Sequence, residues 1–177
     1  MENKTKYEEY MKLFLEENSK VNLISKNDEK YLWEKHVFDS LAIENFFEKF
    51  DTSKIKTILD IGTGGGFPSI PIAITYPHLK VTALDSIAKK IRAVQTIKDK
   101  LNIENLEPIC IRVENLDAKF DMVTSRAVSS LKNICEYALP KLKKGGYFVA
   151  YKSRKTPQEI EEANSILKKY NSKIVDI

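Results

Sequence analysis

The chain shows two hydrophobic periods, and the change from one to the other falls near Thr52. Upstream, apolar residues follow the helical spacing i, i+3, i+4, i+7 and i+8, at Tyr7, Tyr10, Met11, Phe14 and Leu15. A second helix is predicted over about residues 29–50, and its apolar stripe carries Trp33, Val37 and Leu41. Residues 1–53 are therefore expected to form a small N-terminal helical cap.

Beyond Thr52, short β-rich runs alternate with helical runs. Strands are predicted at Thr57–Ile61, Lys80–Asp85, Pro108–Val113, Asp121–Ser125, Tyr147–Tyr151 and Ser172–Ile177. Helices are predicted between them, at Pro68–Thr75, Ile87–Leu101, Ser130–Leu139 and Pro157–Tyr170. This alternation predicts an α/β fold, in which a mostly parallel sheet is covered by helices on both faces. Residues 54–177 should form one core that carries the cap as a single compact unit.

Composition favours a soluble cytoplasmic domain. With 177 residues the chain suits one domain, and no apolar run approaches the roughly 20 residues that a membrane span needs. The charged start MENKTKYEEY does not resemble a signal peptide. The two cysteines, Cys110 and Cys135, stand in apolar surroundings without metal-ligand spacing. We expect buried thiols in a reducing compartment, no membrane association and no metal.

Charge is distributed unevenly along the chain. Residues 1–53 carry 8 basic and 12 acidic side chains, whereas residues 54–177 carry 21 basic and 13 acidic ones. A polyanionic partner would therefore meet the second segment. The densest basic stretch, Lys141–Lys155, comprises Lys141, Lys143, Lys144, Lys152, Arg154 and Lys155. It predicts either the border of an RNA-binding face or a solvated helix end followed by a loop.

Four glycines crowd the bend LDIGTGGGFPSIP that follows the first predicted strand. A dinucleotide fingerprint G-x-G-x-x-G would need glycine at position 67, where Phe67 stands. The pattern present is D-x-G-x-G-x-G, formed by Asp60, Gly62, Gly64 and Gly66. Glycines at such a bend either serve packing alone or let a ligand lie against bare backbone at the carboxyl ends of the strands.

The D-x-G-x-G-x-G signature resembles the first motif of class I S-adenosylmethionine-dependent methyltransferases. Asp85 ends the next predicted strand, where a carboxylate can accept hydrogen bonds from both hydroxyls of an adenosine ribose. An alternative role for Asp85 is to cap the helix that follows. Together the two motifs favour S-adenosylmethionine over a nicotinamide dinucleotide as the ligand.

A longer resemblance covers nearly the whole chain. Its segments are Asn22-Leu23, Lys35-His36-Val37-Phe38-Asp39-Ser40, Asp60 to Pro71, Leu84-Asp85-Ser86, Val113-Glu114, Ser125-Arg126-Ala127 and Tyr151-Lys152. Together they resemble the RsmG (GidB) family, bacterial enzymes that methylate N7 of a guanine in the 530 loop of 16S rRNA. The resemblance implies a Rossmann-like class I fold and cofactor contacts at Gly62, Phe67, Val113, Glu114 and Arg126. Similar proteins continue past a sixth strand into a seventh, so the final strand is expected to be missing here.

Methylation of guanine N7 makes modest demands on an enzyme, because N7 carries a lone pair and no proton. The residues expected to act are therefore positioning groups rather than general bases. Arg126, after the fourth strand, is expected to bind the methionine carboxylate or an RNA phosphate, with a surface salt bridge as the alternative. Lys152, after the fifth strand, would hold RNA phosphate or remain a solvated lysine.

Sequence features of other acceptor classes are missing from the chain. The Asn/Asp-Pro-Pro-aromatic motif of amine methyltransferases is replaced by Ser125-Arg126-Ala127-Val128. Neither cysteine follows a strand end in a cleft-like context, as pyrimidine C5 methylation would require. The aspartate of the Lys-Asp-Lys-Glu set used for ribose methylation is also missing after the fourth strand. A ring nitrogen remains the simplest target.

Three polar residues of the cap share one helical face, His36, Asp39 and Ser40, at i, i+3 and i+4. They would either roof the cofactor cleft and touch the guanine, or form a hydrogen-bonded seam between the cap and the sheet. Phe67 and Trp33 are the candidate stacking aromatics, although Trp33 also fits the core.

The leading hypothesis is a cytoplasmic, monomeric rRNA guanine-N7 methyltransferase. It would use S-adenosylmethionine, release S-adenosylhomocysteine, and act on 16S rRNA or the small ribosomal subunit. Two alternatives stay open, a methyltransferase for a small molecule or protein, and a non-catalytic RNA-binding module that responds to S-adenosylmethionine.

Overall fold

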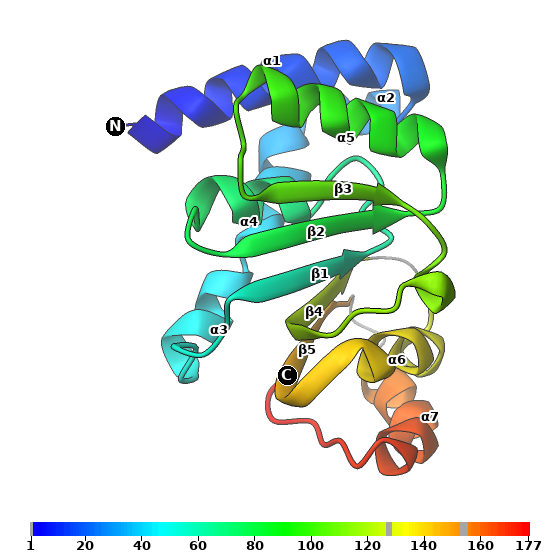
Figure 1. The fold of residues 1–177 in the computed structure, drawn as a ribbon. Coiled ribbons are helices and arrows are strands. Elements are labelled where there is room, and N and C mark those ends of the chain that lie inside the picture. Colours follow the sequence, from blue (N-terminus) through cyan, green and yellow to red (C-terminus); the bar gives the residue numbers. More distant parts are fainter. Residues whose placement is uncertain (1, 127–128, 153–155) are drawn as a thin grey trace.

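A parallel sheet of five strands forms the centre of the molecule (Figure 1). The computed structural model describes residues 2–126, 129–152 and 156–177. In spatial order β3-β2-β1-β4-β5, the strands are β3 (Leu106–Cys110), β2 (Lys80–Asp85), β1 (Thr57–Ile61), β4 (Phe120–Arg126) and β5 (Leu142–Tyr151). Every neighbouring pair is parallel, which confirms the predicted fold class. The chain order reverses between β1 and β4, and ligands bind at such a point in α/β sheets.

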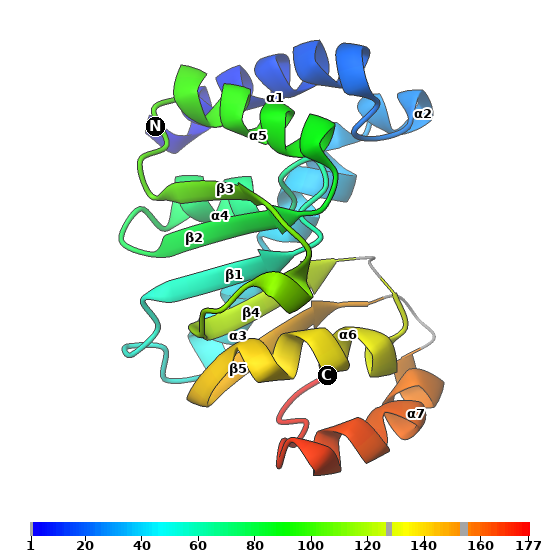
Figure 2. The same cartoon turned by 45° about the vertical axis from the view of Figure 1, so that its right-hand side comes forward.

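Helices cover both faces of the sheet. The α-helices are α1 (Glu2–Val21), α2 (Lys26–Glu29), α3 (Ile43–Lys49), α4 (Ser69–Thr75), α5 (Ala88–Lys100), α6 (Leu131–Ala138) and α7 (Thr156–Lys169). Shorter segments are the π-helix η1 (Trp33–Phe38) and the 3₁₀ turns η2 (Val113–Asn115) and η3 (Leu139–Lys141). In Figure 2, α1 runs beside α5 near β3, while α6 and α7 lie together beyond β4 and β5.

Side chains along β1 point alternately to the two faces of the sheet and contribute to two layers of the core. Ile58 points into a cluster with Tyr10 and Phe14 of α1, whereas its neighbour Leu59 points into a cluster with Cys135 of α6. Successive strand residues face opposite sides of a sheet, so one strand feeds both layers. Tyr10 and Phe14 are fully buried in this arrangement. The N-terminal helix is therefore packed into the main core and is not an appendage.

The predicted helix over residues 29–50 is wrong as a continuous element. The chain there forms the end of α2, the π-helix η1 and then α3, with turns between them. A π-turn contains more residues than an α-turn, so side chains four apart no longer stay in line. Val37 is accordingly buried, whereas Trp33 of the same predicted stripe is 38% exposed and packs edge-on against Tyr7.

The predicted sixth strand, Ser172–Ile177, is also wrong. These residues have no regular structure and are largely exposed, and Lys49 of α3 holds the tail through an ion pair of 2.6 Å with Asp176. β-branched composition suggested a strand, but a strand forms only against a partner. β3 starts at Leu106 and ends at Cys110, earlier than the predicted Pro108–Val113, and its Pro108 is tolerated because β3 is an edge strand.

Two smaller findings concern the cysteines and the helices. Cys135 is buried as predicted, but Cys110 is exposed at the end of β3, which corrects the expectation of two buried thiols. Within the described residues, no helix combines the length and the apolar character needed to cross a membrane.

Candidate functional site

The glycine bend after β1 is pinned to the end of β2. The backbone N–H groups of Gly62 and Thr63 both donate to the carbonyl oxygen of Leu84, at 2.8 and 2.9 Å. Three of the glycines have positive φ, Gly62 at 71°, Gly64 at 57° and Gly66 at 93°. Side chains rarely adopt such conformations, so the bend requires glycine for its backbone path.

Gly66 has a second, steric reason to be glycine. A Cβ atom built there would lie 2.4 Å from Cδ1 of Ile70, in the first turn of α4. A Cβ on Gly65 would lie 3.0 Å from the ring of Phe14, because α1 packs closely over the bend. These two glycines therefore allow a helix of the core and a helix of the cap to approach the bend.

Asp85 links the bend to β2. Its Oδ2 accepts a hydrogen bond from the backbone N–H of Gly64 at 3.0 Å, and its Oδ1 accepts one from Ile87 at 2.9 Å. The side chain is almost buried, with 7% of the residue exposed. The bond to Ile87 joins Asp85 to the residue before α5 but is not a side-chain cap of that helix, and each carboxylate oxygen keeps a second lone pair.

A cavity of about 780 Å³ opens beside this bend at the carboxyl ends of the strands. Such a volume lies within the range of roughly 300–1,000 Å³ typical of small-molecule sites. Seven predicted cofactor residues line it, namely Gly62, Gly64, Phe67, Asp85, Val113, Glu114 and Arg126. Gly66, the eighth, does not line the cavity. The structure therefore brings the predicted set together, with Gly66 shaping the bend behind it.

Several lining residues were absent from the sequence prediction. Leu23, Ile24, Ser25 and Asp28 come from the connection between α1 and η1, and Lys90, Ile111, Arg112 and Tyr137 come from other elements. Among the segments that carry the family resemblance, only Asn22-Leu23 pointed to any of these residues. Ile111 and Arg112 reach the cavity because they directly follow β3, whose carboxyl end lies at the same edge of the sheet. Lys90 and Tyr137 reach it from helices α5 and α6.

Arg126 joins the end of β4 to the cap. Its Nη1 donates to Oδ2 of Asp39 at 3.0 Å and to the carbonyl oxygen of Lys35 at 3.1 Å. Its Nη2 lies 2.9 Å from Nδ1 of His36, and the guanidinium stands over the ring of Phe67 at 5.1 Å. Arg126 thus lines the cavity and also holds the cap. Its contacts with His36 and Asp39 are compatible with both predicted roles of these cap residues, a roof over the cleft and a seam to the sheet.

His36 is held as a neutral imidazole by this contact. Burial lowers its pKa, and the positive charge of Arg126 lowers it further. A guanidinium can only donate, so Nδ1 accepts and the ring proton resides on Nε2. That Nε2 is buried and has no hydrogen-bond partner within the described part of the chain.

Ser40 is fully buried, its Oγ donates to the His36 carbonyl, and its own carbonyl accepts from Tyr151 at 2.7 Å.

Asp60, at the end of β1, is a buried carboxyl beneath the bend. Its Oδ1 accepts from the hydroxyl of Thr124 at 3.2 Å, whereas its Oδ2 has no partner among the described residues. Burial raises its pKa to about 7. The motif contained Asp60, yet the sequence did not reveal this environment, which depends on residues of β4 such as Thr124.

The basic stretch Lys141–Lys155 does not form one patch. Lys141 donates to the carbonyl of Leu116 and Lys143 pairs with Asp121 at 2.9 Å, both near the start of β5. Lys152, past the other end of that ten-residue strand, donates to the Ser129 carbonyl at 2.7 Å and pairs with Glu159 of α7 at 2.9 Å. Lys144 is exposed at the start of β5.

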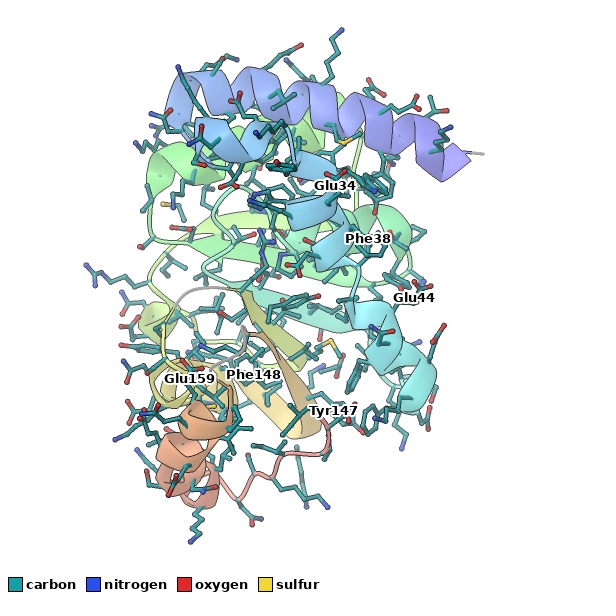
Figure 3. The ribbon with its side chains drawn as sticks, turned by 180° about the vertical axis from the view of Figure 1, so that it is seen from behind. Glu34, Phe38, Glu44, Tyr147, Phe148 and Glu159 are labelled. Atoms are coloured by element: carbon teal, nitrogen blue, oxygen red, sulfur yellow. The ribbon has the colours of Figure 1, made fainter. Side chains whose placement is uncertain are left out.

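The alternative of a solvated helix end followed by a loop is therefore wrong, because residues 142–151 form the strand β5, which is roughly 30 Å long and separates Lys141 from Lys152. Figure 3 places Glu159 on α7, away from Tyr147, which lies beside α3. Arg154 and the Ala127 and Val128 of the quoted segments lie outside the described residues. Whether any of these lysines contacts RNA stays a prediction.

Comparison with known proteins identifies the family. A family model described as "GidB: rRNA small subunit methyltransferase G" matches residues 3–176. The chain belongs to this family. It is 38% identical over 169 residues to the ribosomal RNA small subunit methyltransferase G of Lysinibacillus sphaericus, covering 92% of this chain and 70% of the relative. The Staphylococcus aureus protein of the same name is 41% identical over 165 residues, covering 90% and 68%.

Solved structures agree at the level of the fold. A Staphylococcus aureus protein assigned as a caffeoyl-CoA O-methyltransferase superposes with a TM-score of 0.52 at 21% identity, over 72% of this chain and 71% of that one. A coclaurine N-methyltransferase gives 0.53 at 14% identity, over 63% and 35%. The resemblance found in the sequence is confirmed, and the chain is a member of a methyltransferase family.

Proposed function

We propose that this protein transfers a methyl group from S-adenosylmethionine to N7 of a guanine in the 530 loop of 16S rRNA. Family membership supports rRNA of the small subunit as the substrate. The observation that carries the proposal is the cavity at the sheet's reversal point, where bare glycine backbone and the Asp85 carboxylate face one space. The product would be S-adenosylhomocysteine.

The residues present fit this cofactor. Asp85 retains one lone pair on each oxygen for the two ribose hydroxyls, after its bonds to Gly64 and Ile87. Ile111 and Val113 supply apolar wall beside it for the adenine ring, and the 62–65 bend leaves room for the methionyl part. When bound, the cofactor supplies an electrophilic methyl group on a sulfonium centre.

The chain's own residues then act by positioning. Guanine N7 brings its own lone pair, so no side chain needs to remove a proton. His36 accepts from Arg126 at Nδ1, its Nε2 has no partner among the described residues, and Arg126 is held by Asp39, Lys35 and His36. A held guanidinium places positive charge at the cavity wall without moving, which suits it to fix a carboxylate or an RNA phosphate.

The molecule is proposed to work as a cytoplasmic monomer without a metal, on 16S rRNA or the small ribosomal subunit. Residues 1–53 would act as a helical cap on the 54–177 core. The shared core of α1 and β1 supports treating both as one compact unit.

The test is methyl transfer itself. Tritiated S-adenosylmethionine should label 16S rRNA and not total protein, and m7G should vanish from the rRNA of cells that lack this protein. Calorimetry should detect binding of the cofactor and of S-adenosylhomocysteine. Asp85→Ala should weaken that binding at least tenfold, because it removes a charged acceptor. Binding without product on small-subunit RNA would instead indicate a non-catalytic module, and labelled protein would indicate another acceptor.

A further inference from the structure

A second cavity of about 550 Å³ lies across Arg126 from the first. Its wall consists of Asp39, Ala42 and Ile43 of the cap, Arg126 of β4, and residues 149–152 at the end of β5. Among the described residues, Asp39 and Arg126 alone line both cavities. Their ion pair, with 3.0 Å between Nη1 and Oδ2, is therefore the partition between the two spaces.

We propose that this second cavity receives the acceptor base and that Asp39 is the residue that selects guanine, an inference that rests on the proposed function. A methyl group passes only between sites that meet, and the two cavities meet at the Arg126–Asp39 pair. Ala42, which is exposed, and Val149, which is half-buried, give the second cavity apolar surface suited to the faces of a base. A base that leaves its stack for such a pocket is read at its Watson–Crick edge.

The partition pair carries the hydrogen-bonding groups that guanine requires. Asp39 uses Oδ2 for Arg126, whereas its Oδ1 has no hydrogen bond within the described residues, and 49% of the side chain is exposed. Arg126 retains donors at Nε and at one Nη2 hydrogen in the same part of the chain. Guanine offers an acceptor at O6 beside donors at N1 and N2.

Arg126 therefore donates to O6, and Asp39 accepts from N1–H and the N2 amine. Adenine would place its N6 amine against Arg126 and would offer Asp39 no N2 amine. Neither contact uses N7, which remains open for methylation. This assignment gives Asp39 a role beyond holding the cap. Its carboxylate, with Oδ1 free, selects guanine by accepting hydrogen bonds from the base.

The decisive experiment compares guanosine with inosine, which lacks only the N2 amine, at the mapped position of a small-subunit rRNA transcript. Wild-type protein should methylate guanosine roughly 10- to 100-fold more efficiently, the value of a hydrogen bond to a charged group. Asp39→Asn keeps an oxygen for Arg126 but turns an amide donor toward the base. It should lose activity on guanosine and treat both bases alike.

A wild-type protein that does not distinguish the two bases would overturn the assignment, as would an Asp39→Asn variant that still does. The cavity itself is tested by Ala42→Phe, which adds a ring at a residue of the cavity wall. The control is Ala118→Phe, at an exposed alanine between η2 and β4. Only Ala42→Phe should lower kcat/KM for RNA, at unchanged cofactor affinity. Equal activity of the two variants would exclude this cavity, whereas a wild-type protein inactive on every rRNA would overturn the proposed function itself.

Discussion

Individual residues of the bend show how backbone geometry, rather than side-chain chemistry, shapes this site. Gly62, Gly64 and Gly66 all adopt positive φ. What each glycine faces was not in the pattern. Gly64 lines the cavity, whereas Gly66 lies against Ile70. The same residue type therefore serves ligand access at one position and helix packing two positions later.

Gly66→Ala tests this distinction against a matched control. The new Cβ would lie 2.4 Å from Ile70 and the backbone would be strained, so we expect a loss of several kcal/mol in stability and loss of cofactor binding. Gly145 also has positive φ, 78°, but a Cβ there meets nothing within 4 Å. Gly145→Ala should cost only about 1 kcal/mol. Chemical denaturation gives both values, and equal losses would contradict the steric account.

At the scale of elements, one carboxylate ties the starts of three strands together. Asp121 of β4 accepts from the backbone N–H groups of Lys56 and Thr57 and from the Thr57 hydroxyl, and it pairs with Lys143 of β5. Partial burial alone would raise its pKa, but the hydrogen bonds from Lys143, Lys56 and Thr57 prevail and lower it to about 2. A sequence does not reveal such a clamp, because it depends on which strands become neighbours.

Asp121→Ala should therefore destabilise the fold by about 2 kcal/mol at pH 7. Because the folded pKa is depressed, this contribution is present above about pH 4 and is lost as the pH falls toward 2. Urea unfolding at pH 7 and at pH 3 should show a smaller difference between variant and wild type at the lower pH. Asp117→Ala, an exposed position in the loop before β4, should change stability by less than about 0.5 kcal/mol. A difference independent of pH would argue against the clamp.

For the whole molecule, the question is where RNA approaches. The uneven charge of the chain favours residues 54–177 as the RNA platform, but Lys141 and Lys143 serve structural contacts near the start of β5. Both cavities open at the other end of the sheet, where exposed Arg112 lines the first cavity. Backbone phosphates near the acceptor base would meet that end first.

Arg112→Glu should weaken rRNA binding and reduce its salt dependence by about one counterion, whereas Lys144→Glu should have a smaller effect. Fluorescence titrations across a range of salt concentrations would measure both. A larger loss from Lys144→Glu would restore the basic stretch at the start of β5 as the principal RNA border.

The sequence by itself determined the architecture and the place of the first cavity. β1 and β2 have the predicted bounds, because each strand is encoded by its own run of apolar residues. The glycines and Asp85 mark where these strands end. Only the tertiary structure decided what depends on contacts between distant segments. These features include the division of the second predicted helix into shorter helices, the lack of strand structure at residues 172–177, and the hydrogen bond from Arg126 to Asp39 of the cap. The physical reason is that strand partners and ion pairs are selected by neighbours far along the chain, whereas glycine bends and apolar periods are fixed by adjacent residues.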